Sequence, residues 1–181
     1  GPARELPLVT DFTNKEESQL WSIADADNDG KTFFWQYNPN FKDQGFFYYQ
    51  CEYKPTTNAN DWIISPKYKF EADKAYKALV YARPDDISKN EMMEVWLVKD
   101  YNLNTAVKLS EFRVNIAPMK EADEYSLAVR CISNMEVAYW LAIAKVEVSE
   151  NLEGHIRGDV YDNEFNPVEG VVVSLKGTEY S

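Results

Sequence analysis

The chain has 181 residues, a formal net charge of −11, a hydrophobic fraction of 45% and an aromatic fraction of 14%. Nucleic-acid binding depends on clusters of Lys and Arg that contact phosphates, so this acidic chain is not expected to bind nucleic acid. The longest apolar run, residues 137–144, is far too short to cross a bilayer, so we expect no membrane insertion.

The predicted elements are almost all strands. Residues 6–12 form the first, and the capping-box pattern at 13–16 predicts one helical turn that ends by Leu20. Residues 100–105 are predicted to be a loop. Further strands are predicted at residues 32–37, 45–53, 76–83, 92–99, 106–114, 124–132 and 139–148.

These strands are short and are separated by Pro, Asn, Asp and Gly, and no segment sustains a helical apolar period. This pattern predicts an all-β fold, an antiparallel sandwich or barrel. The clearest alternation lies in residues 45–53. There one face carries Phe47, Tyr49 and Cys51, and the other carries Phe46, Tyr48 and Gln50.

The character of the chain changes near residue 150. Residues 1–150 are expected to form one domain, and residues 151–181 to be the truncated start of a second small β-sandwich. Two Val-rich strands are predicted within 154–181, but about 30 residues cannot bury a core alone.

An acidic loop, Asp25-Ala-Asp27-Asn-Asp29-Gly30, is the most distinctive motif. Three alternating carboxylates followed by a glycine supply the oxygen ligands that Ca²⁺ prefers, so Asp25, Asp27 and Asp29 are candidate metal ligands. The loop is not an EF-hand, because Gln36 stands at the twelfth position. The alternative is a solvated turn whose Asp side chains accept hydrogen bonds from their own backbone.

The remaining aromatic residues divide into core and surface candidates. Core packing is favoured over sugar stacking for the tryptophans in strand-like or motif positions, which are Trp21, Trp62, Trp96 and Trp140. An exposed aromatic platform for a ligand is predicted from Trp35, Tyr37, Tyr48 and Tyr101. Simple packing or scattered exposure is the alternative for these four.

Catalytic residues are not evident. The only histidine is His155, so a Ser-His-Asp or Cys-His mechanism lacks its base in residues 1–150. Cys51 and Cys131 are interpreted as buried free thiols, with one disulfide as the alternative. Arg83 and Arg130 lie in predicted strands, and an interior or edge ion pair is favoured for them over a clamp on a ligand. Solvated acids are the default for the carboxylates Asp85, Asp86, Glu91, Glu94, Glu121, Asp123 and Glu124.

Several segments of residues 6–150 resemble, in their order, the cleaved-adhesin or choice-of-anchor J family. They are Asp11-Phe12, the stretch from Trp21 to Gly30, Trp35, Asp61-Trp-Ile-Ile-Ser-Pro66, Met93-Glu-Val-Trp-Leu97, Tyr125-Ser-Leu-Ala-Val-Arg130 and Tyr139-Trp-Leu-Ala-Ile143. These families are jelly-roll modules of gingipain hemagglutinin-adhesin regions and other secreted bacterial proteins, and they are similar in architecture to MAM domains.

Two further points follow from comparison with families. Residues 154–181, with Ile156-Arg-Gly158 and Pro167-Val168-Glu-Gly170, are similar to the opening of carboxypeptidase-regulatory-like domains. Ala144-Lys145 stands where the adhesin family usually carries an acidic pair that helps to hold a cation. Either the cation is held without that pair, or Lys145 neutralises the acidic loop.

The resemblance implies a non-catalytic, extracellular binding module on a jelly-roll sandwich. A glycan or a host protein would be its partner, and the module would be covalently part of a longer secreted or cell-surface bacterial protein, with Ca²⁺ as a possible cofactor. A purely structural spacer or accessory domain beside a catalytic domain is the alternative.

Overall fold

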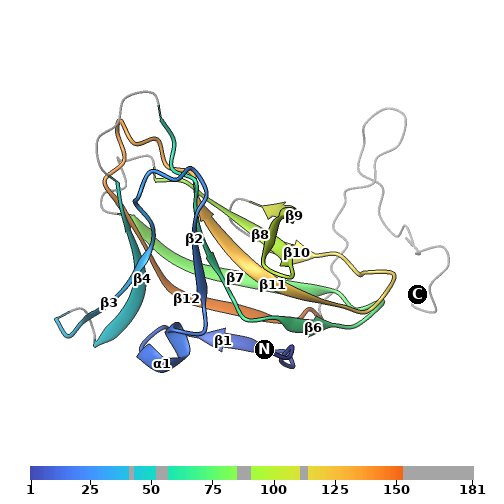
Figure 1. Ribbon diagram of the computed structural model, residues 1–181. Helices are drawn as coiled ribbons and strands as arrows, with labels where there is room; N and C mark the ends of the chain where they lie inside the picture. The colour runs from blue at the N-terminus through green and yellow to red at the C-terminus, as the bar shows by residue number, and fades with distance from the viewer. Residues whose placement is uncertain (41–42, 52–56, 85–90, 111–113, 153–181) are drawn as a thin grey trace, which may run out of the picture.

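The computed structural model describes residues 1–40, 43–51, 57–84, 91–110 and 114–152. Within these ranges the chain forms twelve strands and one short helix (Figure 1). In chain order they are β1 Leu8–Thr10, α1 Lys15–Ser18, β2 Ser22–Asp25, β3 Phe34–Asn38, β4 Gln44–Gln50, β5 Asp61–Ile64, β6 Tyr68–Phe70, β7 Tyr76–Pro84, β8 Met93–Lys99, β9 Asn102–Ser110, β10 Val114–Ile116, β11 Asp123–Cys131 and β12 Trp140–Glu150.

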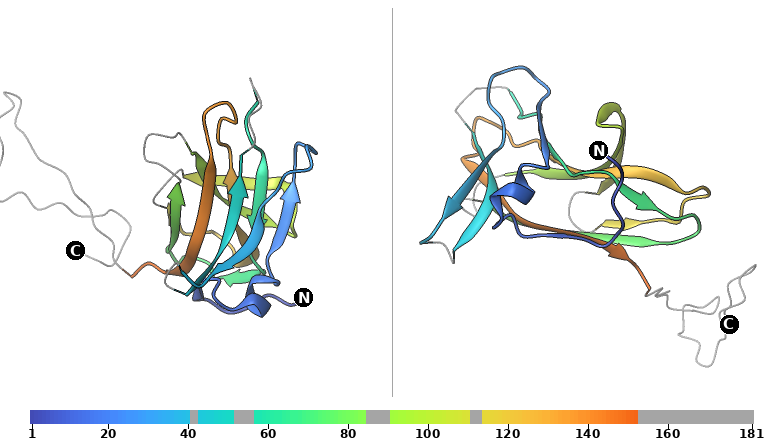
Figure 2. Two further views of the ribbon diagram at one scale, coloured as in Figure 1. Left: turned by 90° about the vertical axis from the view of Figure 1, so that its left-hand side faces the viewer. Right: turned by 60° about the horizontal axis from the view of Figure 1, so that its bottom comes forward.

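The strands form two six-stranded sheets, and every pairing between named strands is antiparallel. The first sheet has the order β10-β7-β12-β4-β3, with β1 also paired to β12. The second has the order β2-β5-β11-β8-β9, with β6 also paired to β11. The chain passes repeatedly from one sheet to the other, and the sheets lie against each other as two layers (Figure 2). The predicted antiparallel jelly-roll β-sandwich is confirmed.

The main core lies between the sheets and is rich in aromatic rings. On β4 the predicted alternation is confirmed, because Phe47 and Tyr49 are buried while Phe46 and Tyr48 are only half-buried. The ring of Phe12 meets Trp21 edge-on at 5.1 Å and Phe47 at 4.9 Å between centroids. Trp21 therefore packs in the core, as predicted.

A second, smaller apolar cluster covers the outer face of the second sheet. Trp62, Ile64 and Val98 are buried there, and Leu103 and Ala106 of β9 pack over them. Trp62 is thus a packing residue, as predicted, but it lies outside the main core. Its ring contacts Trp96 at 5.5 Å between centroids.

The prediction of a loop at residues 100–105 is correct for residues 100 and 101 and wrong for residues 102–105, which belong to β9. The chain reverses at Asp100 and Tyr101, which both have positive φ, 50° and 57°, so β9 begins directly at Asn102. Such two-residue turns usually contain glycine, which is why the sequence pattern did not reveal this one. The strand predicted at 106–114 is split between β9 and β10, which belong to different sheets.

Smaller differences concern the N-terminal region. The helix is capped by Asn14, whose side chain accepts hydrogen bonds from the N–H groups of Glu16 and Glu17, and not by Thr13. Strands β2 and β6 were not predicted. The single helix in the described ranges has only four residues and cannot reach across a bilayer. Of the predicted second domain, residues 151–181, only residues 151 and 152 are among the described residues. His155 therefore lies outside them.

Candidate functional site

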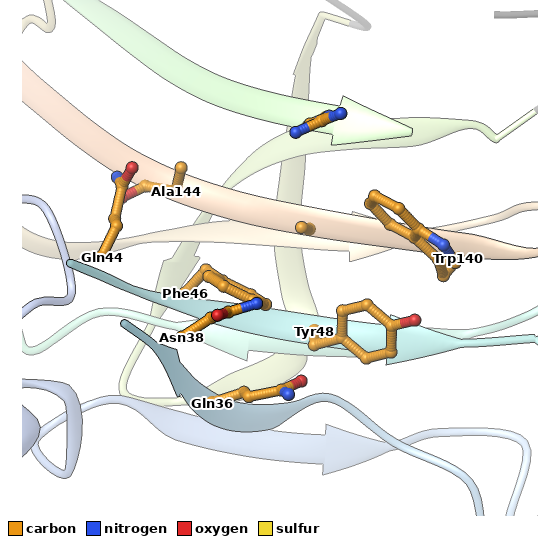
Figure 3. A pocket seen from close by; sticks show the side chains of 9 residues that line it. Gln36, Asn38, Gln44, Phe46, Tyr48, Trp140 and Ala144 are labelled. Carbon is orange, nitrogen blue, oxygen red and sulfur yellow. The ribbon is translucent and has the colours of Figure 1, made fainter. Parts of the chain in front are cut away.

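A groove of about 300 Å³ lies on the outer face of the first sheet, over β3, β4, β12 and β7 (Figure 3). Its lining combines aromatic rings, amide groups, a guanidinium and two alanines. The lining residues are Gln36, Asn38, Gln44, Phe46, Tyr48, Arg83, Trp140, Ala142 and Ala144. The groove therefore offers flat apolar surfaces and hydrogen-bonding groups together.

The depth of the groove comes from differences in side-chain size across the sheet. Ala142 is paired with Tyr48 on one side and with Arg83 on the other. Residues directly opposite each other on neighbouring strands project from the same face. The methyl group of Ala142 therefore forms a floor between two long side chains, and Ala144 extends this floor along β12.

A β-bulge in β12 explains the orientation of Lys145. The register against β7 shifts between Ile143 and Lys145, and Ile143 and Val146 are both buried, so Ala144 and Lys145 both face outward. The Lys145 ammonium pairs with Glu147 and lies 5.4 Å from the ring centroid of Tyr81. The suggestion that Lys145 neutralises the acidic loop is therefore wrong.

Aromatic rings form one wall of the groove. The ring of Tyr48 lies 5.5 Å from Trp140 and 6.1 Å from Phe46, measured between centroids. Phe34, which is 44% exposed, extends the row at 5.3 Å from Tyr48. In Figure 3 the rings of Tyr48 and Trp140 stand over β4 and β12.

Amide side chains supply most of the polar lining. The amide nitrogen of Gln44 donates to the carbonyl of Ala144 at 3.2 Å, and the Asn38 side chain accepts from the N–H of Asn40 at 3.0 Å. Each amide has two donor hydrogens and an acceptor oxygen, so both retain unused hydrogen-bonding capacity. None of the lining residues carries a carboxyl group, so the groove as described lacks the pair of acids that glycoside hydrolysis requires.

Of the four residues predicted as a ligand platform, only Tyr48 lines the groove. The indole of Trp35 donates to the carbonyl of Phe12 at 2.9 Å, and Tyr37 stacks on Trp35 at 6.4 Å on the opposite face of β3. Tyr101 belongs to the turn between β8 and β9, in the other sheet. These four residues therefore do not form a single platform.

Sequence reasoning missed two important lining residues. Trp140 was predicted to be core but is half-buried in the groove, and for Arg83 an ion pair was favoured over a contact with a ligand. The signal was available in β12, where Leu141 and Ile143 occupy the inward positions and thereby direct Trp140 and Ala142 outward.

The acidic loop brings its three carboxylates together. One oxygen from each of Asp25, Asp27 and Asp29 lies within 4.8 Å of the others. The N–H of Gly30, which has φ 81°, donates to Asp25 at 2.9 Å, and the N–H of Lys31 donates to Asp29 at 2.7 Å. The clustered carboxylates are the arrangement expected of a cation site. The hydrogen bonds from backbone N–H groups are those expected of the alternative, a solvated turn.

The pKa values of the loop carboxyls shift in opposite directions. Burial raises the pKa of Asp25, but hydrogen bonds from the Gly30 and Asp29 N–H groups and from Asp27 outweigh it, so its pKa is lowered. Burial, the hydrogen bond to Asp25 and the charge of Asp29 raise the pKa of Asp27. Asp27 is therefore the more readily protonated of the two.

Asp61 was not predicted as part of this cluster. It is fully buried, it faces Asp25 across the β2–β5 pair, and neither of its oxygens accepts a hydrogen bond from a described residue. Burial, together with the charges of the nearby carboxylates, raises the pKa of Asp61 to about 7.

An orphaned buried carboxyl next to three clustered carboxylates is a donor set that fits a hard cation. Asp25, Asp27 and Asp29 would hold Ca²⁺, with Asp61 behind them, and the ion would neutralise the cluster and brace the loop. Calcium binding stays a prediction.

A second charged cluster, on the second sheet, is internally paired. Glu94 accepts a hydrogen bond from Arg130 at 3.1 Å and from Lys108 at 2.6 Å. The guanidinium of Arg130 lies 5.2 Å from the ring centroid of Trp62. The predicted ion pair of Arg130 is confirmed, and this cluster serves packing.

The comparisons agree with this architecture. No family model matches the sequence, and no curated protein matches it. The K1 cleaved adhesin domain of Lys-gingipain from Porphyromonas gingivalis W83 matches with a TM-score of 0.55 at 14% identity, over 81% of this chain and 99% of that one. The K2 cleaved adhesin domain of Lys-gingipain matches with a TM-score of 0.58 at 12% identity, over 80% and 99%. This chain is therefore similar in fold to the cleaved adhesin domains that its sequence resembles.

Proposed function

We propose that the domain is a non-catalytic binding module that holds an oligosaccharide in the groove over β12. The observation that carries this proposal is the lining itself, in which aromatic faces and amide groups share one concave site. Sugars present apolar C–H faces and a rim of hydroxyl groups. Sites that bind such ligands combine ring surfaces with a few placed polar groups.

The absence of a carboxyl group from the described lining supports binding without hydrolysis. The fold shared with adhesin domains supports an extracellular or cell-surface location within a longer protein. A host protein is the second candidate partner, and a spacer without a ligand is the competing function.

Nuclear magnetic resonance on the ¹⁵N-labelled protein tests the proposal. Trp140 has one indole N–H in the groove, and its signal is assigned by its loss in Trp140→Phe. Mannotetraose, xylotetraose, cellotetraose and tetragalacturonic acid are titrated separately. We expect at least one of them to shift the Trp140 signal in a saturable manner.

Affinity measurements on variants give the second readout. Tyr48→Ala should weaken binding of the active probe at least about tenfold, because a stacking surface is lost. Tyr101→Asn is the matched control, since it removes an exposed aromatic in the other sheet and Asn tolerates the positive φ there. If no probe shifts Trp140, or if Tyr101→Asn weakens binding as much as Tyr48→Ala, the groove is not the site.

A further inference from the structure

Among the described residues that line the groove, one side chain is charged, and that charge is positive. The other eight lining residues are aromatic, amide or alanine, and the guanidinium belongs to Arg83, near the end of β7. The whole chain has a formal net charge of −11. A guanidinium in a concave site offers N–H donors to an anionic group of a ligand.

The strand register places this cation at a defined distance from the aromatic wall. Ala142 is the partner of Arg83 on one side and of Tyr48 on the other. Adjacent strands are about 4.8 Å apart, so the backbones of Arg83 and Tyr48 are separated by about 10 Å. A single sugar ring seated over the Ala142 methyl group would reach both side chains.

We propose that the groove selects oligosaccharides that carry a carboxylate, with the carboxylated sugar seated over Ala142, its ring against Tyr48 and its carboxylate on Arg83. This inference rests on the proposed function and specifies its ligand class. A guanidinium presents its N–H groups as a planar fork that matches the two oxygens of a carboxylate. Its five N–H donors allow it to bind a ligand while it also contacts a protein neighbour.

Matched probes separate charge from sugar structure. Tetragalacturonic acid and its full methyl ester have the same backbone, but only the acid carries carboxylates. Sialyllactose and lactose form a second pair, in which the carboxylate is on a terminal sugar. The two pairs distinguish a uronic-acid chain from a terminal sialic acid as the source of the charge.

Affinities are measured by isothermal titration calorimetry on the wild type, Arg83→Gln and Lys145→Gln. Lys145 lies on the same outer face but does not line the groove, so its variant controls for the loss of one nearby positive charge. We expect the acid of at least one pair to bind the wild type at least about tenfold more tightly than its neutral partner. Arg83→Gln should remove this preference, so that the acid and its neutral partner bind the variant equally, while Lys145→Gln should retain it.

Other results overturn the inference. If the neutral partner binds as tightly as the acid, or if Arg83→Gln and Lys145→Gln have equal effects, Arg83 does not select the ligand. If neither acid binds at millimolar concentration, the selectivity is likewise refuted. In each of these cases the Trp140 titration with the neutral tetraoses decides separately whether the groove binds sugars at all.

Discussion

The rings of Tyr48 and Trp140 lie 5.5 Å apart at 32° to each other, although their residues are separated by most of the domain in sequence. Strands β4 and β12 are neighbours in the first sheet, so the two rings meet on its outer face. This relationship gives the groove a continuous aromatic wall, and the proposed ligand can reach that wall only if the floor beside it stays low.

The floor can be raised without disturbing the core. Ala142→Leu should fill the groove and abolish oligosaccharide binding, because the added carbons occupy the space above the floor. Stability should change by less than about 1.5 kcal/mol, since the side chain faces outward. Calorimetric titration and urea unfolding measure the two effects. Retention of wild-type affinity would show that the ligand does not lie over Ala142.

Gly45 is expected to tolerate no side chain. A Cβ built there would lie 2.0 Å from the carbonyl oxygen of Phe12, which also accepts the indole hydrogen bond of Trp35. Gly45→Ala should lower the free energy of unfolding by at least about 2 kcal/mol, through steric displacement of this backbone. Urea denaturation measures the loss.

Gly30→Ala is the informative comparison for Gly45→Ala. Gly30 has positive φ but open space where a Cβ would lie. Its substitution should cost only about 1 kcal/mol, from backbone strain alone. Equal losses for the two variants would contradict the steric explanation.

Glu94 should make stability depend on acid pH. Burial disfavours its ionised form, but hydrogen bonds from Lys108 and Trp96 and the charges of Lys108 and Arg130 outweigh burial and lower its pKa. Its stabilising contribution is therefore present above the pKa of the unfolded state, about 4.5, and is lost as pH falls through the lower folded pKa.

Glu94→Gln tests this dependence. The variant should be about 1–3 kcal/mol less stable than the wild type at pH 7, and the difference should shrink toward pH 3. Thermal unfolding across this pH range measures it. Glu5→Gln removes an exposed partner of Lys69 and should change stability by less than about 1 kcal/mol. A pH-independent effect of Glu94→Gln would show that packing, and not charge, is responsible.

Calcium should raise the melting temperature if the acidic loop binds it. Affinity in the range of about 10⁻⁴–10⁻³ M is expected, as in extracellular modules, so millimolar CaCl₂ is required. Asp27→Asn and Asp61→Asn should each reduce the calcium-dependent shift, whereas Asp73→Asn, at an exposed position with φ 60°, should not. An equal shift in all three variants would assign the effect to non-specific ion binding.

The two cysteines should be unreactive in the native protein. Cys51 and Cys131 are both free and buried, and a hydrogen bond to Cys131 together with burial raises the pKa of the Cys51 thiol. A thiol reagent should therefore label neither residue in buffer and both in urea, because burial excludes the reagent from both thiols and the raised pKa also keeps Cys51 out of its reactive thiolate form. Two unreactive cysteines in urea without reductant would instead establish the disulfide alternative.

The sequence predicted the fold well because alternation is a local property. The alternation of residues 45–53 identified the buried and outer faces of β4, and turn residues (Pro, Asn, Asp and Gly) marked the boundaries of most strands. The turn at Asp100 and Tyr101 was missed because non-glycine residues adopt positive φ there. The bulge at Ala144 was missed because it depends on pairing with β7.

The groove could not be predicted from the sequence, because its lining residues belong to strands that are distant along the chain. Tyr48 could be named as an exposed aromatic residue, but its partners Trp140 and Arg83 come from β12 and β7. Only the strand order brings these residues onto one face. The acidic loop was visible because it is contiguous, whereas Asp61 joins it through the β2–β5 pair.

Strand β12 is the last of the strands that the structure describes, and it is also a central one, because it pairs with β1, β4 and β7. During synthesis the first sheet therefore cannot close until residue 150 has left the ribosome. Until then its earlier strands expose unpaired edges, which invite association with other chains. The first sheet should thus close only after β12 has emerged, and truncation before residue 140 should leave it in separate parts.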